Sequence, residues 1–181
     1  MSEDFLKPVF IDAFDLDDAW FQALSTILDK GHIYTITRGS YEGQKRLEFD
    51  FVSIRVRKHA HQIIPIIPEG MNIPAPTDMD YIQGYLSYLL TGAKTETEDY
   101  TYGERLVDPK VKIKQNLNGQ ELVSDMPLNV NQIEEVIKMY KEKGSGTNQA
   151  VMEIGMPSDI KLIDPPCLRL IDTRLRYGKL H

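Results

Sequence analysis

The stretch that organises this chain lies near its C-terminal end and reads Asp164-Pro165-Pro166-Cys167-Leu168-Arg169-Leu170-Ile171. The two prolines disfavour a helix, because proline fixes its own φ and pushes the preceding residue toward extended geometry. The residues after Cys167 are rich in branched aliphatics and predict a strand. Alternate side chains of a strand share a face, so we expect Cys167 and Arg169 to point the same way. A guanidinium beside a thiol favours the thiolate, which is the nucleophilic form.

A structural role is the alternative for Cys167. Free cysteine is among the most buried residue types and usually behaves as a small hydrophobe. No histidine that could act as its base lies near it in the sequence. The chemistry of the residue alone therefore leaves both roles open.

Several further motifs lie around this cysteine. Gly178-Lys179-Leu180-His181 follows it, and Asn131-Gln132-Ile133, Pro157-Ser158-Asp159-Ile160 and Tyr102-Gly103-Glu104-Arg105 precede it. Together with Pro-Pro-Cys-Leu, they resemble the active-site region of thymidylate synthases and of the related pyrimidine hydroxymethylases. The resemblance extends over residues 100–181. Within the family, the sequence is most similar to the shorter, archaeal-type branch.

The resemblance implies an α+β fold, with a mixed, bulged β-sheet and helices packed on one face. The other face would form a homodimer. It also implies the methylation of dUMP to dTMP with 5,10-methylene-tetrahydrofolate as cosubstrate. In that reaction a cysteine thiolate adds to C6 of the pyrimidine, and C5 then attacks the one-carbon unit of the folate.

The same resemblance assigns roles to five residues. Cys167 would be the nucleophile, and Tyr102 would line the site and assist proton transfer. Arg38, Arg105 and Arg169 are candidate substrate-binding residues, because a guanidinium can bind a phosphate bidentately. For Arg38 and Arg105, a structural role at the surface is an equal alternative.

The sequence also departs from the family pattern. Ser145-Gly146-Thr147-Asn148 stands where the family has a paired arginine, and the catalytic glutamate of the second helix has no clear match near Gln83 or Tyr85. The tryptophan-rich segment before the Tyr-Gly motif is missing. The sequence ends at His181, before the family's residues for base and ribose, so we expect a C-terminally truncated and inactive chain. A dCMP or dUMP hydroxymethylase and a non-catalytic nucleotide-binding homologue are the alternatives.

Length and composition predict a single domain over residues 1–181. Acidic residues outnumber basic ones by 27 to 21, and the net charge of −6 argues against a nucleic-acid or membrane-surface binder. One cysteine excludes an internal disulfide and suits a reducing compartment. The sequence shows neither a signal peptide nor an apolar run of ~20 residues, so we expect a cytoplasmic protein.

Local patterns predict the main elements. We expect helices over 17–30 and 78–91, and a third helix that begins after an Asn129 cap. We expect strands over 32–38, 44–58 and 150–154, with a β-bulge where the alternation of the second strand changes phase. Asn118-Gly119 predicts the turn of a hairpin within 108–123. His59 and His61 lack nearby ligand partners, so no metal site is expected.

Overall fold

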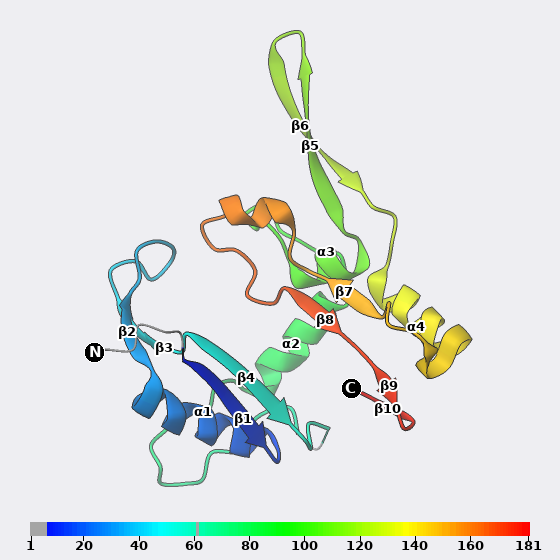
Figure 1. The fold of residues 1–181 in the computed structure, drawn as a ribbon. Coiled ribbons are helices and arrows are strands. Elements are labelled where there is room, and N and C mark those ends of the chain that lie inside the picture. Colours follow the sequence, from blue (N-terminus) through cyan, green and yellow to red (C-terminus); the bar gives the residue numbers. More distant parts are fainter. Residues whose placement is uncertain (1–6, 61) are drawn as a thin grey trace. The chain divides into compact units, whose positions relative to one another are not determined.

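The computed structural model describes residues 7–60 and 62–181. By its internal contacts the chain divides into two compact units, Met1–Ile82 and Gln83–His181, and the boundary falls inside helix α2 (Met79–Leu89) (Figure 1). The units are described one by one. That the whole chain forms one domain stays a prediction.

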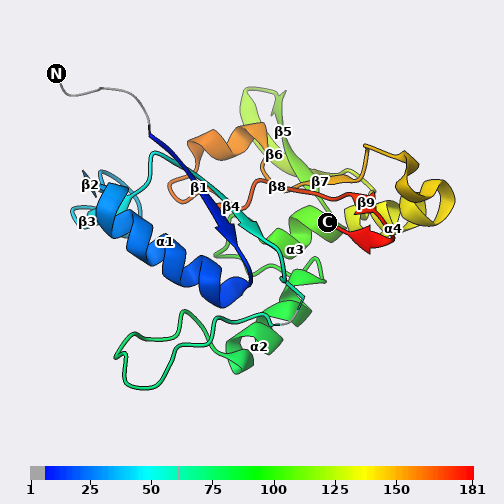
Figure 2. The same cartoon turned by 60° about the horizontal axis from the view of Figure 1, so that its bottom comes forward.

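The first unit is built on a parallel strand pair and one helix. Strands β1 (Pro8–Ala13) and β4 (Phe51–Val56) run parallel in register, and helix α1 (Leu16–Lys30) packs against both (Figure 2). Alternate residues of β1 are buried, and Val9, Ile11 and Ala13 form a small core with Ala19 of α1. Since a strand sends alternate side chains to opposite faces, the other face of β1 carries exposed Phe10 and Asp12.

The predicted long strand over 44–58 is in fact two strands. β3 (Lys45–Glu48) pairs antiparallel with β2 (His32–Thr35), and β4 pairs with β1, so the chain changes partner at Phe49–Asp50. The change of phase in the sequence marks this break and not a β-bulge. The predicted helix over 17–30 is confirmed, and a hydrogen-bonded turn between β2 and β3 spans Gly39–Gly43.

The second unit contains most of the remaining elements. They are α3 (Tyr102–Val107), β5 (Lys110–Leu117), β6 (Gln120–Pro127), α4 (Gln132–Lys143), the 3₁₀ turns η1 (Gly144–Gly146) and η2 (Pro157–Lys161), β7 (Val151–Glu153), β8 (Leu170–Asp172), β9 (Leu175–Arg176) and β10 (Lys179–Leu180). Helix α4 contacts α3 and β7, and the buried side chains between these elements include Leu106, Val136 and Ile154.

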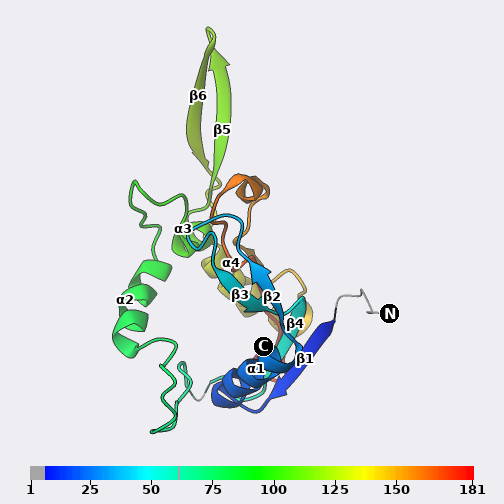
Figure 3. The same ribbon diagram turned by 90° about the vertical axis from the view of Figure 1, so that its left-hand side faces the viewer.

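Strands β5 and β6 form a long antiparallel hairpin that extends away from α3 and η2 of its own unit (Figure 3). Asn118 and Gly119 both have positive φ, at 54° and 83°, as a two-residue hairpin turn requires. This confirms the predicted hairpin. A second turn of the same kind, at Tyr177-Gly178, joins β9 to β10.

Three other predictions differ from the structure. The N-cap of α4 is Asn131 and not Asn129, because Asn131 accepts the amide of Glu134 while Asn129 has a left-handed φ of 54°. The strand expected at Cys167 begins only at Leu170. The Tyr-Gly motif lies in a short helix, α3, which the apolar periodicity of the sequence did not predict.

The chain combines helices and strands, so the prediction of an α+β fold is supported. Its described strands form five two-stranded pairs, four antiparallel and one parallel, and not one mixed sheet. Over residues 7–60 and 62–181, no helix is long and apolar enough to cross a bilayer.

Candidate active site

Cys167 lies on an exposed bend between η2 and β8. The residue before it, Pro166, is fully buried and anchors the bend. The two consecutive prolines favour an extended chain at this position, because each proline disfavours helical geometry for the residue before it. The thiol is therefore accessible on a segment whose preceding residue is fixed.

Tyr100 interacts electrostatically with this thiol, and Tyr102 lies beside Tyr100. The rings of Tyr100 and Tyr102 are 6.0 Å apart between centroids. Burial is the main cause that raises the pKa of Tyr100, and the charges of Tyr102 and Cys167 raise it further. Charges act in this way only over short distances, so Cys167 and Tyr102 both lie within electrostatic reach of the Tyr100 phenol.

Arg105 completes this group from the next turn of α3. Its guanidinium lies over the Tyr100 ring, 5.6 Å from the centroid, and donates to Asp159 Oδ1 at 2.8 Å. The charge of Arg105 opposes the other influences on Tyr100 by lowering its pKa. We call Tyr100, Tyr102, Arg105, Asp159 and Cys167 the cysteine–tyrosine cluster.

The ion pair between Arg105 and Asp159 is buried, with 9% and 2% of the two side chains exposed. Asp159 uses its second oxygen to accept the amide of Met156 at 2.7 Å, and Arg105 also donates to the Ile154 carbonyl at 3.4 Å. Buried charges need such partners, because an unpaired charge in a low-dielectric interior is costly. The pair therefore ties α3 to the segment that leads to Cys167.

Close packing of α3 against the end of α2 requires a glycine at position 103 of the Tyr-Gly motif. A Cβ on Gly103 would lie 2.3 Å from the Thr91 carbonyl oxygen and 2.4 Å from that of Tyr88. These are backbone atoms at the C-terminal end of α2, so no side-chain rotation could relieve the contact. Thr101 caps α3 by accepting the Glu104 amide at 3.0 Å.

Gln132 holds the neighbouring strand to α3. Its amide nitrogen donates to the carbonyls of Arg105 and Glu153 at 2.7 and 2.8 Å, and its oxygen accepts the Glu153 amide at 2.8 Å. The side chain thus makes the hydrogen bonds to the Glu153 backbone that a neighbouring strand would make along the edge of β7.

Arg169 lies opposite a bulge between β7 and β8. Its carbonyl accepts the amides of both Ile154 and Gly155, at 2.9 and 2.8 Å, so two residues oppose one. A bulge bends the strand that carries it, here the chain at Ile154–Gly155, and Arg169 is the residue opposite, two positions after Cys167. The direction of the Arg169 side chain relative to the thiol stays a prediction.

Of the five residues predicted for the site, three gather in the cluster: Cys167, Tyr102 and Arg105. Arg169 is close to Cys167 in sequence, and Arg38 is an exposed residue of the first unit. The roles of all five stay predictions. Arg105 has a structural role, since its guanidinium is paired with Asp159.

Tyr100 and Asp159 were not predicted as site residues. Asp159 stands in the Pro157-Ser158-Asp159 motif, and Tyr100 precedes Tyr102 by two positions, but neither pattern reveals a contact across the fold. Over residues 7–60 and 62–181, no group of three or more His, Cys, Asp or Glu side chains is arranged to hold a metal ion. The prediction for His61 lies outside the described residues.

Four curated archaeal proteins match the chain, each named "Putative thymidylate synthase", and three of them are described here. The Methanosarcina mazei protein is 28% identical over 173 residues, or 94% of this chain and 66% of its own length. The Methanosarcina acetivorans protein is 27% identical over 181 residues (100% and 70%), and that of Methanosarcina barkeri is 28% identical over 168 residues (92% and 64%). The chain spans about two thirds of the length of these relatives.

No family model matches the chain, and no solved structure matches it significantly. The names of the relatives, at 25–28% identity, support a thymidylate synthase-like family and a transferase.

Proposed function

We propose that this chain carries the nucleophile of a thymidylate synthase-like enzyme that methylates dUMP to dTMP with 5,10-methylene-tetrahydrofolate. The observation that carries the proposal is the cysteine–tyrosine cluster, in which an exposed thiol lies within electrostatic reach of the Tyr100 phenol and the Tyr100 ring lies 6.0 Å from that of Tyr102. The names of the archaeal relatives support the same reaction class.

The chemistry begins at Cys167. Its thiolate adds to C6 of the pyrimidine, and the electron pair of the C5–C6 double bond moves onto C5 and the C4 carbonyl. C5 then forms a bond to the methylene carbon of the folate. Loss of the C5 proton breaks the bond between that carbon and the folate nitrogen and leaves an exocyclic methylene on the Cys167 adduct. Hydride from the tetrahydrofolate adds to this methylene, and departure of the thiolate restores the C5–C6 double bond, so the products are dTMP and dihydrofolate.

The tyrosines suit the proton transfers in this sequence. Because burial and the neighbouring charges raise the pKa of Tyr100, its phenol stays protonated at neutral pH and acts as a hydrogen-bond donor. Tyr102, at the start of α3, is the phenol that we assign to proton exchange with the substrate. Arg105 holds Tyr100 in place through its contact with the ring face.

We also propose a homodimer. Phe10 and Phe51 lie on the face of the β1–β4 pair opposite α1, and they are 75% and 55% exposed. Large exposed apolar side chains on one face mark an interface. Phe10→Lys should shift a sedimentation profile from dimer to monomer, and a parent chain that sediments as a monomer at every concentration would refute the dimer.

The test of the reaction is an intact mass after incubation with 5-fluoro-dUMP and methylene-tetrahydrofolate. Fluorine at C5 blocks the loss of that substituent, so the covalent complex accumulates. We expect a mass increase equal to both ligands in a chain extended to the full length of its relatives, and none in the Cys167→Ser variant of that extended chain. The loss of the adduct in Cys167→Ser assigns it to that cysteine.

A companion measurement is the rate at which iodoacetamide alkylates Cys167 in the folded and in the urea-unfolded chain. The proposed role of Cys167 as the nucleophile predicts faster alkylation at neutral pH in the folded chain than in the unfolded one, because a catalytic cysteine is more reactive than a cysteine in an unfolded chain. Alkylation of the folded chain no faster than that of the unfolded chain, together with no adduct in the extended chain, would contradict the enzyme and favour a non-catalytic nucleotide-binding homologue.

A further inference from the structure

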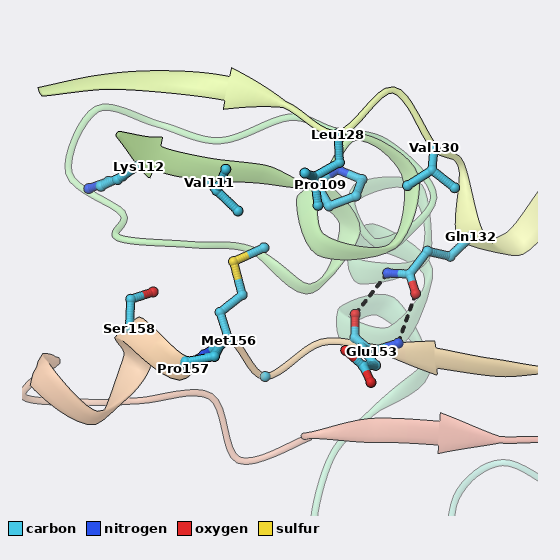
Figure 4. Close-up of a pocket in the computed structure, with 11 residues that line it drawn as sticks. Pro109, Val111, Lys112, Leu128, Val130, Gln132, Glu153, Met156, Pro157 and Ser158 are labelled. Atoms are coloured by element: carbon cyan, nitrogen blue, oxygen red, sulfur yellow. Dashed lines mark hydrogen bonds between the residues drawn. The ribbon is translucent and has the colours of Figure 1, made fainter. Parts of the chain in front are cut away.

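The two faces of the β5–β6 hairpin differ in chemistry. Side chains alternate along a strand, so every second residue of β5 lies on one face, and these residues are Lys110, Lys112 and Lys114. The other face carries Val111, which lines the apolar cavity drawn in Figure 4. The three lysine side chains therefore lie on the face of the hairpin away from Val111.

The lysine face borders a second cavity of the same unit. Its volume is about 340 Å³, near the lower end of the range of about 300–1,000 Å³ that small-molecule sites occupy. The hairpin base, the loop before α3, α3 itself and η2 contribute its walls. Six cationic side chains line it, against four carboxylates: Lys94, Arg105, Lys110, Lys112, Lys114 and Lys161. This is a local excess of positive charge in a chain whose net charge is −6.

Four of the six cations already have a carboxylate partner. The pairs are Arg105–Asp159, Lys94–Glu104, Lys110–Asp108 and Lys114–Glu121. Lys112 and Lys161 take part in none of the ion pairs found over residues 7–60 and 62–181. They are the cations of this cavity whose charge is available to a ligand.

Two of the lining carboxylates, Asp99 and Asp125, are also outside the ion pairs of the described residues. Asp125 acts on Lys110. A hydrogen bond with Asp108 is the main cause that raises the pKa of Lys110, and the charges of Glu104 and Asp125 raise it further while burial lowers it. Both unpaired carboxylates repel an anion in the cavity, so the removal of either should strengthen its binding.

Lys112 and Lys161 belong to different walls. Lys112 lies on β5, and Lys161 is the last residue of η2. Ser158 of η2 also lines the cavity and adds a neutral donor. Two ammonium groups on separate elements suit an anion with more than one charge. A diphosphate group carries charged oxygens on several sides, which suits ammonium groups because they impose no planar geometry as a guanidinium does.

We propose that this cavity binds a compact oxyanion with several negative charges, of the diphosphate class, between Lys112 of β5 and Lys161 of η2. Cys167 does not line it. Arg105 and Asp159 line it and also belong to the cysteine–tyrosine cluster, but they are paired with each other. Cys167→Ser should therefore bind diphosphate as the parent chain does, so this proposal and the proposed reaction fail independently.

The test is a titration of inorganic diphosphate into the full chain at constant ionic strength, followed by calorimetry and by two-dimensional NMR. We expect one site and shifts of the amide signals of Lys112, Ser158 and Lys161. Both lysines are exposed, so their substitution removes charge and little packing. Lys112→Gln and Lys161→Gln should each weaken binding about threefold to tenfold, and the double variant about tenfold to a hundredfold. Lys138→Gln is the matched control, because Lys138 is an exposed lysine of α4 in the same unit that lines neither cavity.

Asp125→Asn tests the sign of the ligand charge and should strengthen diphosphate binding about twofold to threefold, because it removes a repelling carboxylate. ADP carries the same group on a nucleoside. Tighter binding of ADP than of diphosphate would assign the site to a nucleotide, and binding no tighter would assign it to the free anion. Absence of diphosphate binding, equal weakening by Lys138→Gln, or weaker binding by Asp125→Asn would each overturn the proposal.

Discussion

Replacing Asp159 with asparagine should cost more stability than almost any other single polar substitution in this chain. Asp159→Asn keeps the shape of the side chain but removes its charge, so Arg105 becomes an unpaired cation in a site where its side chain is 9% exposed. Removing one partner of a buried ion pair costs about 3–5 kcal/mol, because the remaining charge has lost its compensation.

The assay is urea unfolding followed by circular dichroism. With a urea m-value of about 2 kcal/mol per molar, a loss of 3–5 kcal/mol lowers the unfolding midpoint by about 1.5–2.5 M. The double variant Arg105→Met with Asp159→Leu leaves no unpaired charge, so it should lose less stability than Asp159→Asn alone. Lys94→Met is the comparison variant, because it breaks the ion pair between Lys94 and Glu104, which is less buried than the pair between Arg105 and Asp159.

Two results would refute this reasoning. A midpoint for Asp159→Asn within about 0.3 M of the parent would mean that water solvates Arg105 in the folded chain. A double variant that loses more stability than the single one would mean that the attraction between Arg105 and Asp159 itself stabilises the fold, and that an unpaired Arg105 is not the main cost.

Three other predictions follow from local geometry. Gly103→Ala should destabilise the chain by about 3 kcal/mol, since its Cβ meets backbone oxygens at 2.3–2.9 Å, while Gly84→Ala in α2, where the added methyl meets nothing within 4 Å, should stabilise by about 0.5–1 kcal/mol in the same urea assay. Gln132→Ala removes three hydrogen bonds and should cost about 2–3 kcal/mol; a loss below about 0.5 kcal/mol would show that water replaces them. Hydrogen bonds from Arg55 and then Arg57 hold the pKa of Asp12 well below its ordinary value, so the stability it contributes is present above pH 3.8 and is lost as the pH falls toward the folded pKa. The midpoint difference between the parent and Asp12→Asn should accordingly shrink below pH 3.8, and a difference that grows there would contradict the assignment.

Some of this fold could be predicted because neighbouring residues decide it. The apolar spacing of α1 and the Asn118-Gly119 turn depend on the backbone geometry of a few consecutive residues, so the helix and the hairpin appeared where we expected them. The absence of a helix at Pro165 and Pro166 is of the same kind, because proline disfavours a helix whatever packs against it.

Other features needed the tertiary structure because distant residues decide them. The partner change at Phe49–Asp50 depends on which strand lies alongside, and alternation in one strand carries no information about its neighbour. α3 is too short to show an apolar period, and its packing on the end of α2 selects Gly103.

The candidate site divides in the same way. The sequence by itself predicted a nucleophile and one phenol, Cys167 and Tyr102, because short motifs that resemble the family carry them, and both roles stay predictions. Only the tertiary structure brought Tyr100 and Asp159 to Arg105, since Asp159 lies 54 positions further along the chain. The physical reason is that a buried charge takes whichever partner the fold places within hydrogen-bonding distance, and the spacing of residues along the sequence does not encode that distance.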